Sequence, residues 1–145
     1  MAHGRVVRAG DAGSFWTAGS DSDSRLEVMV GEVQYLAGPS LHIHEYQEDT
    51  FFVLEGVVTV QIDEEVIELA VGDFASAPPG VSHTFTNTDP NRTARMLNAM
   101  APARGSGQLL AALHSGADQA DLEQLGMLTY GKSVGPSLPE KLGLR

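Results

Sequence analysis

The stretch HIHEYQEDTFFVLEG, residues 42–56, contains the pattern that decides the fold. Two histidines one residue apart lead through an acidic segment into an apolar run that ends at a glycine. Alternate side chains of a strand face the same side, so His42 and His44 should project together. If the following run is also a strand, Asp49 shares a face with Phe51. The stretch therefore predicts two strands that turn two imidazoles and a carboxylate toward one interior.

The β pattern extends on both sides, from Arg25 to about Met100. In the first run, RLEVMV, the apolar residues Leu26, Val28 and Val30 alternate with other residues. Further short apolar runs are separated by glycine, proline, aspartate and asparagine: VVTVQI, VIELA, FASAP, HTFTN and ARMLNAM. Short strands at this spacing, without intervening helices, predict an all-β sandwich or barrel rather than a parallel α/β sheet.

The chain changes character after Pro102. The segments SGQLLAALHSG and ADLEQLGML show helical spacing of leucines, whereas GKSVGPSLPEKLGLR reads as an irregular strap. We expect a β-barrel domain with an N-terminal strap over residues 1–104. Residues 105–145 should form a helical extension that packs on the barrel or on a dimer partner.

Composition narrows the possible partners. The 145 residues carry 9 Lys and Arg against 19 Asp and Glu, a net charge of -10, which disfavours nucleic acid and anionic membranes. No cysteine is present, which excludes disulfides, zinc–thiolate sites and thiol nucleophiles and fits a cytoplasmic location. No apolar run approaches the length of a membrane span. We therefore expect a small-molecule partner.

A third histidine follows a rigid turn in GDFASAPPGVSHTFTN, residues 72–87. The turn Pro78-Pro79-Gly80 reverses the chain, and His83 then begins a new run in which Phe85 shares its face. An antiparallel return of this kind can bring His83 over His42 and His44.

Both stretches resemble the two signature motifs of the cupin superfamily. The first family motif is glycine, five residues, His-x-His, three or four residues, glutamate, six residues and glycine. His42, His44 and Gly56 fit this spacing, and the acid position falls on Asp49. Gly38 misses the opening spacing by two residues.

The second family motif is glycine, five residues, Pro-x-Gly, two residues, histidine, three residues and asparagine, and it is matched in full. The matching residues are Gly72, Pro78, Gly80, His83 and Asn87. Fifteen residues separate Gly56 from Gly72, which equals the short spacing between the motifs in the family. The resemblance to the superfamily covers about residues 25–100, and the helical tail also resembles that of many small bacterial cupins similar to quercetin dioxygenases.

The resemblance implies a double-stranded β-helix, or jelly roll, with one divalent transition metal bound by His42, His44, Asp49 and His83. Imidazole and carboxylate ligands suit Fe, Mn, Ni, Cu, Co or Zn and do not choose among them. Asp49 would also serve in catalysis, as a base once it is displaced from the metal.

Position 49 departs from the family, which usually has glutamate there. Three interpretations stay open: Asp49 binds the metal directly, Asp49 binds it through water, or Glu48 replaces it by a local shift. We favour direct binding, because a shift by one residue would turn Phe51 outward.

The residues expected to line a substrate pocket are Phe51, Phe85, Tyr35, Met96 and Asn98. Apolar walls of this kind suit an aromatic or enol-type substrate. The leading hypothesis is a metal-dependent dioxygenase-type oxidoreductase that works as a homodimer. The alternatives are a non-oxidative isomerase, cyclase or lyase that uses the metal as a Lewis acid, and a non-catalytic binding cupin.

Overall fold

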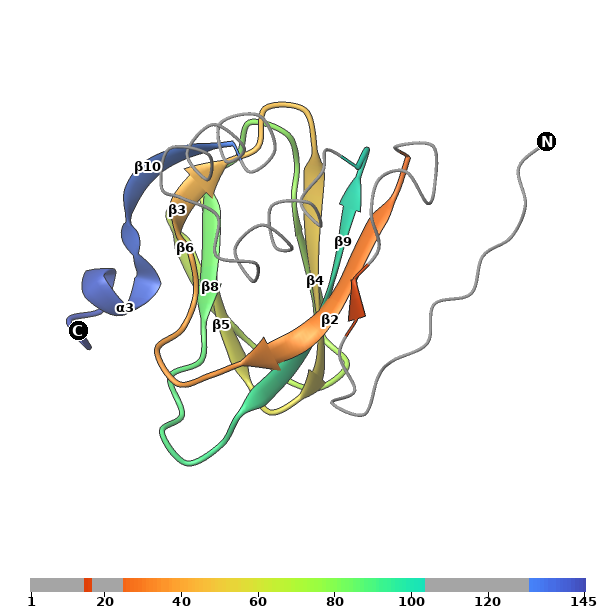
Figure 1. Ribbon diagram of the computed structural model, residues 1–145. Coiled ribbons are helices and arrows are strands. Elements are labelled where there is room, and N and C mark those ends of the chain that lie inside the picture. The colour runs from red at the N-terminus through yellow and green to blue at the C-terminus, as the bar shows by residue number, and fades with distance from the viewer. Residues whose placement is uncertain (1–14, 17–24, 104–130) are drawn as a thin grey trace, which may run out of the picture.

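The computed structural model describes residues 15–16, 25–103 and 131–145, which form two five-stranded antiparallel sheets facing each other (Figure 1). The first sheet contains, in spatial order, β1 (Phe15–Trp16), β2 (Glu27–Val33), β9 (Ala94–Ala101), β4 (Glu48–Glu55) and β7 (Phe74–Ala77). The second contains β10 (Lys132–Ser137), β3 (Ser40–Ile43), β8 (His83–Thr86), β5 (Val58–Ile62) and β6 (Glu65–Leu69). A short helix, α3 (Leu138–Lys141), follows β10. The predicted all-β jelly roll with a short C-terminal helix is confirmed.

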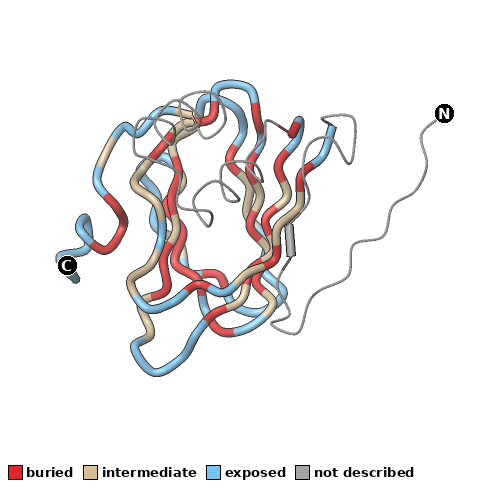
Figure 2. Tube along the Cα trace, in the orientation of Figure 1, coloured by how far each residue is buried: buried red, intermediate tan, exposed pale blue. Residues whose placement is uncertain are grey.

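The hydrophobic core lies between the two sheets, and β4 shows how the sequence builds it. Its residues Asp49, Phe51 and Val53 are buried, whereas the residues between them are only half-buried. Phe51 and Val53 are completely buried and belong to a core cluster supplied by strands of both sheets. The strand β9 shows the same alternation, and strands of both sheets contribute buried positions (Figure 2). Because Asp49 shares their face, β4 turns its carboxylate toward the same interior.

The strand β2 turns its less apolar face to the core. Val33 belongs to the core cluster, and β2 pairs with β9 in unbroken register from Glu27 to Val33. Residues 27, 29, 31 and 33 therefore face the core cluster, and Val28 and Val30 lie on the opposite face of β2, where Val30 is nevertheless buried. Glu27 is completely buried as a result, while the neighbouring Leu26 is 40% exposed. The alternation seen in the sequence is present, but it places an acid inside the barrel.

The prediction of an irregular strap over the last fifteen residues is wrong for its first half. Residues 132–137 form β10, which pairs antiparallel with β3. Gly131 makes this close approach possible: its φ is +78°, and a Cβ at this position would overlap the carbonyl oxygen of Ile43. The C-terminal segment thus supports the strand that carries His42.

The helical spacing predicted for residues 106–116 and 120–128 lies outside the described residues. The division of the chain at residues 104 and 105 therefore stays a prediction. Among the described residues, the helical part of the extension is α3, whose first turn contains Pro139 and a capping box between Ser137 and Glu140.

Candidate metal centre

Three histidines converge from the second sheet. His42 on β3 and His83 on β8 are direct partners in the antiparallel pairing of these strands, and their ring centroids lie 4.5 Å apart. His44 follows the end of β3, with its ring centroid 4.9 Å from that of His42 and 5.0 Å from that of His83. The backbone N–H of Gly80 donates to the carbonyl of His44 at 2.8 Å. The Pro-Pro-Gly turn noted in the sequence therefore helps to fix the backbone of His44.

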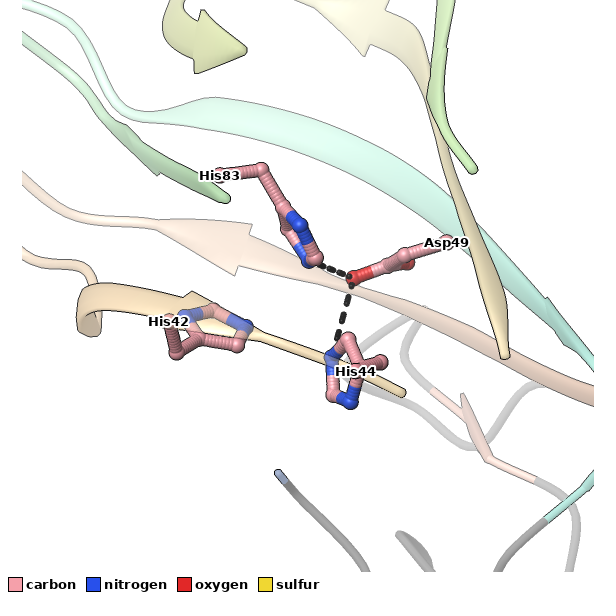
Figure 3. A group of neighbouring side chains, drawn as sticks. All are labelled: His42, His44, Asp49 and His83. Atoms are coloured by element: carbon pink, nitrogen blue, oxygen red, sulfur yellow. Dashed lines mark hydrogen bonds and ion pairs between the residues drawn. The ribbon is translucent and has the colours of Figure 1, made fainter. Parts of the chain in front are cut away.

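The carboxylate comes from the opposite sheet. Oδ2 of Asp49 lies 3.1 Å from Nε2 of His83 and 3.7 Å from Nε2 of His44 (Figure 3). Glu48 is exposed and lies on the other face of β4. The structure thus places Asp49, and not Glu48, beside the histidines.

The four side chains have the composition and the size of a site for one metal ion. All four are buried, and one possible ligand atom from each lies within 4.8 Å of the others. Bonds of about 2.0–2.2 Å hold the ligand atoms of such an ion roughly 3–4 Å apart, which is close to this spread. Nitrogen and carboxylate ligands suit a divalent transition metal. The described part of the chain therefore contains a buried His/Asp cluster compatible with one metal ion.

The hydrogen bonds around the cluster favour a cation at its centre. Nδ1 of His42 lies 2.8 Å from the carbonyl oxygen of Ser40, and Nδ1 of His83 lies 2.9 Å from that of Val81. A carbonyl only accepts hydrogen bonds, so each Nδ1 carries the proton, and each Nε2 of the neutral ring presents a lone pair. Metal-binding histidines in proteins are usually held in this manner.

The contact between His83 and Asp49 also favours a cation between these side chains. With Nδ1 protonated, Nε2 of a neutral His83 faces a carboxylate oxygen at 3.1 Å, and two acceptors repel unless a proton or a cation lies between them. The other oxygen of Asp49, Oδ1, is buried and has no hydrogen-bond partner among the described residues. A buried carboxylate oxygen needs such a partner or a cation, so the residues present fit a metal ion.

Burial also keeps two of these imidazoles neutral. It lowers the pKa of His44 from 6.5 to about 4, with further lowering from the neighbouring His42 and His83 and an opposing effect of Asp49. Burial, and after it the nearby His83, lowers the pKa of His42. Metal ligation requires neutral imidazole, so this environment prepares both rings for it.

The lowered pKa of His44 predicts that the metal-free protein loses stability as the pH falls from about 6.5 to about 4. In this range the unfolded chain binds a proton at His44 that the folded chain does not bind, so lower pH favours unfolding. Melting temperatures measured in a chelating buffer across this range test the prediction. The variant His44→Gln should show a shallower dependence, and parallel curves for the two proteins would contradict it.

The predicted pocket residues fall into two groups. The ring of Phe51 lies 5.9 Å from that of His83, so Phe51 adjoins the cluster, and the ring of Phe85 lies 5.8 Å from that of Phe51. Met96 and Asn98 are buried on the inner face of β9. Whether these four residues line a substrate pocket stays a prediction.

Tyr35, the fifth predicted pocket residue, is not brought to the cluster. It is 46% exposed and forms a bridge to Asn87, beyond the end of β8 that is far from His83. Asn87 comes four residues after His83 along the strand direction, a distance of about 13 Å.

Glu27 was not identified from the sequence as a residue near the site. It is completely buried on the inner face of β2 and pairs in register with Met100, which in turn pairs with Asp49. The sequence offered one indication, which is that the charged Glu27 lies within an alternating strand. A charged residue in such a strand ordinarily faces solvent, so it did not point to the interior.

The comparison with protein families agrees with the fold and the motifs. Residues 25–100 match the model of the cupin domain, and the chain belongs to the cupin family. Over 44 residues the chain is 41% identical to the quercetin 2,3-dioxygenase of Bacillus subtilis (strain 168). This match covers 30% of the chain and only 13% of the length of that enzyme.

Solved structures show the same fold. The crystal structure of TT1209 from Thermus thermophilus matches with a TM-score of 0.54 and 26% identity, over 66% of this chain and 90% of that one. A cupin protein, BF4112, from Bacteroides fragilis matches with a TM-score of 0.59 and 23% identity, over 71% of this chain and 87% of that one. In the described residues, no helix is long and apolar enough to cross a membrane.

Proposed function

We propose that this cupin is a metal-dependent enzyme that acts on a small organic substrate carrying a phenol or enol oxygen, with dioxygenase-type oxidation as its reaction. The observation that carries the proposal is the group of four buried side chains with metal-ligand chemistry, in which Nε2 of His83 lies 3.1 Å from a carboxylate oxygen of Asp49. The local similarity to a quercetin dioxygenase supports the oxidative chemistry.

A divalent metal bound there would polarise a substrate oxygen and lower its pKa. The protein's own contribution is to hold and orient the ligands. The carbonyls of Ser40 and Val81 keep two imidazoles in the tautomer that directs Nε2 inward. Phe51, which packs against Phe85, places apolar surface beside the cluster, and such a surface excludes water and suits an aromatic ring.

Oxygen uptake tests the proposal. Protein reconstituted separately with each candidate metal is given quercetin, simple catechols or 1,3-diketones, and oxygen consumption is compared with substrate loss. A dioxygenase consumes one O₂ for each substrate molecule, because both oxygen atoms enter the product.

The variant Asp49→Asn provides the control and should lose this activity together with its metal. Turnover that continues without oxygen would instead assign a non-oxidative isomerase, cyclase or lyase. Tight binding without turnover would assign a binding cupin.

A further inference from the structure

We propose that Thr50 and Asn98 are positioning residues for the metal centre: their side chains hold the backbone of β4 where the short carboxylate arm of Asp49 reaches the histidines. The inference rests on the proposed function, because it concerns a ligand of the same site. Asp49 belongs to the cluster of four side chains, whereas Thr50 and Asn98 do not. These two residues therefore act through Asp49 and not on the metal itself.

The ladder between β4 and β9 is interrupted directly after Asp49. The pairing of the two strands includes Asp49 and then Phe52, but it omits the two positions between them. In a continuous antiparallel ladder, Thr50 would be paired with Ala99. The pairing of β2 with β9 keeps an unbroken register over the same part of β9. The interruption is therefore confined to the side of β9 that faces β4.

Two side chains form hydrogen bonds across this interruption. The N–H of Ala99 donates to Oγ1 of Thr50 at 3.0 Å, and this hydroxyl donates to the carbonyl of Ala99 at 2.8 Å. The carbonyl of Thr50 accepts from Nδ2 of Asn98 at 3.0 Å. A carbonyl only accepts hydrogen bonds, so the nitrogen of the Asn98 amide must face it. We call this pair of side chains, Thr50 and Asn98, the side-chain rung.

Both members of the side-chain rung are polar residues with apolar neighbours. Asn98 is buried on the inner face of β9 between Met96 and Met100. Thr50 is half-buried on the opposite face of β4 from Asp49, next in its row to the half-buried Phe52. A polar group that leaves water is costly unless it is hydrogen-bonded. The bonds to the opened ladder account for an amide and a hydroxyl at these two positions.

The position of the β4 backbone decides whether Asp49 can bind a metal. The aspartate side chain is one methylene shorter than that of glutamate, and the histidines belong to the opposite sheet. Oδ2 of Asp49 nevertheless lies 3.1 Å from Nε2 of His83 (Figure 3). Metal–oxygen bonds of about 2.0–2.2 Å tolerate little displacement. Because Thr50 follows Asp49 directly, a change in the side-chain rung moves the backbone from which this short arm extends.

A double-mutant cycle on metal affinity tests the proposal. Thr50→Val removes the hydroxyl and keeps the size of the side chain, and Asp49→Glu lengthens the carboxylate arm by one methylene. The cobalt affinities of the wild type, both single variants and the double variant are measured by competition with a chromophoric chelator. The matched control is Thr86→Val, which removes a buried hydroxyl that donates to the carbonyl of Ala37 at 2.7 Å.

We expect Thr50→Val to bind cobalt about tenfold more weakly than the wild type, as is typical when a group that orients a ligand is lost. Without the hydroxyl, the N–H of Ala99 loses its acceptor, so β4 shifts and the short arm of Asp49 no longer reaches the metal. The longer arm compensates for this shift. Adding Asp49→Glu to Thr50→Val should therefore restore most of the affinity, whereas Asp49→Glu alone should weaken binding. Thr86→Val should bind cobalt as the wild type does.

The cycle separates failure of this inference from failure of the proposed function. A Thr50→Val variant that binds cobalt like the wild type overturns the inference. A loss of affinity that Asp49→Glu does not restore also overturns it, because a merely structural effect does not depend on the length of the carboxylate arm. In both cases the proposed metal site stands. A wild type that binds cobalt no better than Asp49→Asn overturns the proposed function and this inference with it.

A second variant protects the test from a folding defect. Melting temperatures of the metal-free proteins show which variants are folded. If Thr50→Val does not fold, Asn98→Ala removes the other half of the side-chain rung and takes its place in the cycle. Asn98→Ala should show the same loss of cobalt affinity and the same recovery with Asp49→Glu, and the absence of either effect overturns the inference.

Discussion

Replacing His83 by alanine lowers the affinity of the protein for a divalent transition metal by more than about 100-fold. Loss of a group that merely orients a ligand costs about 10–100-fold, and His83 is proposed to be a ligand itself. The variant also leaves the buried Asp49 without its 3.1 Å neighbour. Competition titrations of purified, metal-free protein with a chromophoric chelator measure the change.

Two acidic neighbours supply a matched control for the same experiment. Asp49→Asn removes a carboxylate that lies among the histidines, and Glu48→Gln removes the adjacent carboxylate, which is exposed. The first variant should lose metal affinity as His83→Ala does, and the second should stay within about twofold of the wild type, as expected for an exposed group. Equal affinities for Asp49→Asn and Glu48→Gln would contradict the ligand assignment.

Replacing Phe51 by alanine lowers the free energy of unfolding by about 3–5 kcal/mol, the typical cost of removing a buried phenylalanine ring. Phe51 is completely buried, belongs to the core cluster and contacts both His83 and Phe85. The cavity also removes the wall against which the ring of His83 rests, so metal affinity should fall in the variant that remains folded. Chemical denaturation and the same chelator titration measure the two effects.

The control is Phe74→Ala, which removes the same ring from an edge strand. Phe74 lies on β7, pairs with Phe52 and is 61% exposed. Its loss should change the free energy of unfolding by no more than about 0.5 kcal/mol. A comparable loss in the two variants would show that Phe51 does not belong to the packed interior.

The cluster of three histidines and Asp49 could be predicted from the sequence, because the patterns that indicate it lie within short stretches of the chain. The alternation of strands fixes that His42 and His44 share a face and that Asp49 shares one with Phe51, and the motif spacing relates them to His83. The choice between Asp49 and Glu48 follows from the same alternation. The sequence could not settle which metal the cluster would bind, because imidazole and carboxylate ligands suit several metals.

Which face of β2 turns toward the core could not be predicted from the sequence. The alternation shows which residues share a face, but it does not show which of the two faces meets the core. Val28 and Val30 make one face more apolar, yet the pairing of β2 with β9 turns Glu27 inward. Such pairing is a long-range property, so only the assembled sheet shows it.

The strand β10 was missed for a different reason. Gly135 and Pro136 are typical of loops, and proline cannot donate to a sheet ladder. An edge strand can contain proline, because the N–H groups on one side of it have no partner strand. In the described sheet, β10 is an edge strand.

The most direct test of the metal centre is a crystal structure with anomalous scattering collected on both sides of the absorption edges of the candidate metals. We predict a single anomalous peak at bonding distance from Nε2 of His42, His44 and His83 and from a carboxylate oxygen of Asp49. Protein grown with each candidate metal in turn and showing no peak among these four side chains, or imidazoles turned away from one another, would contradict it.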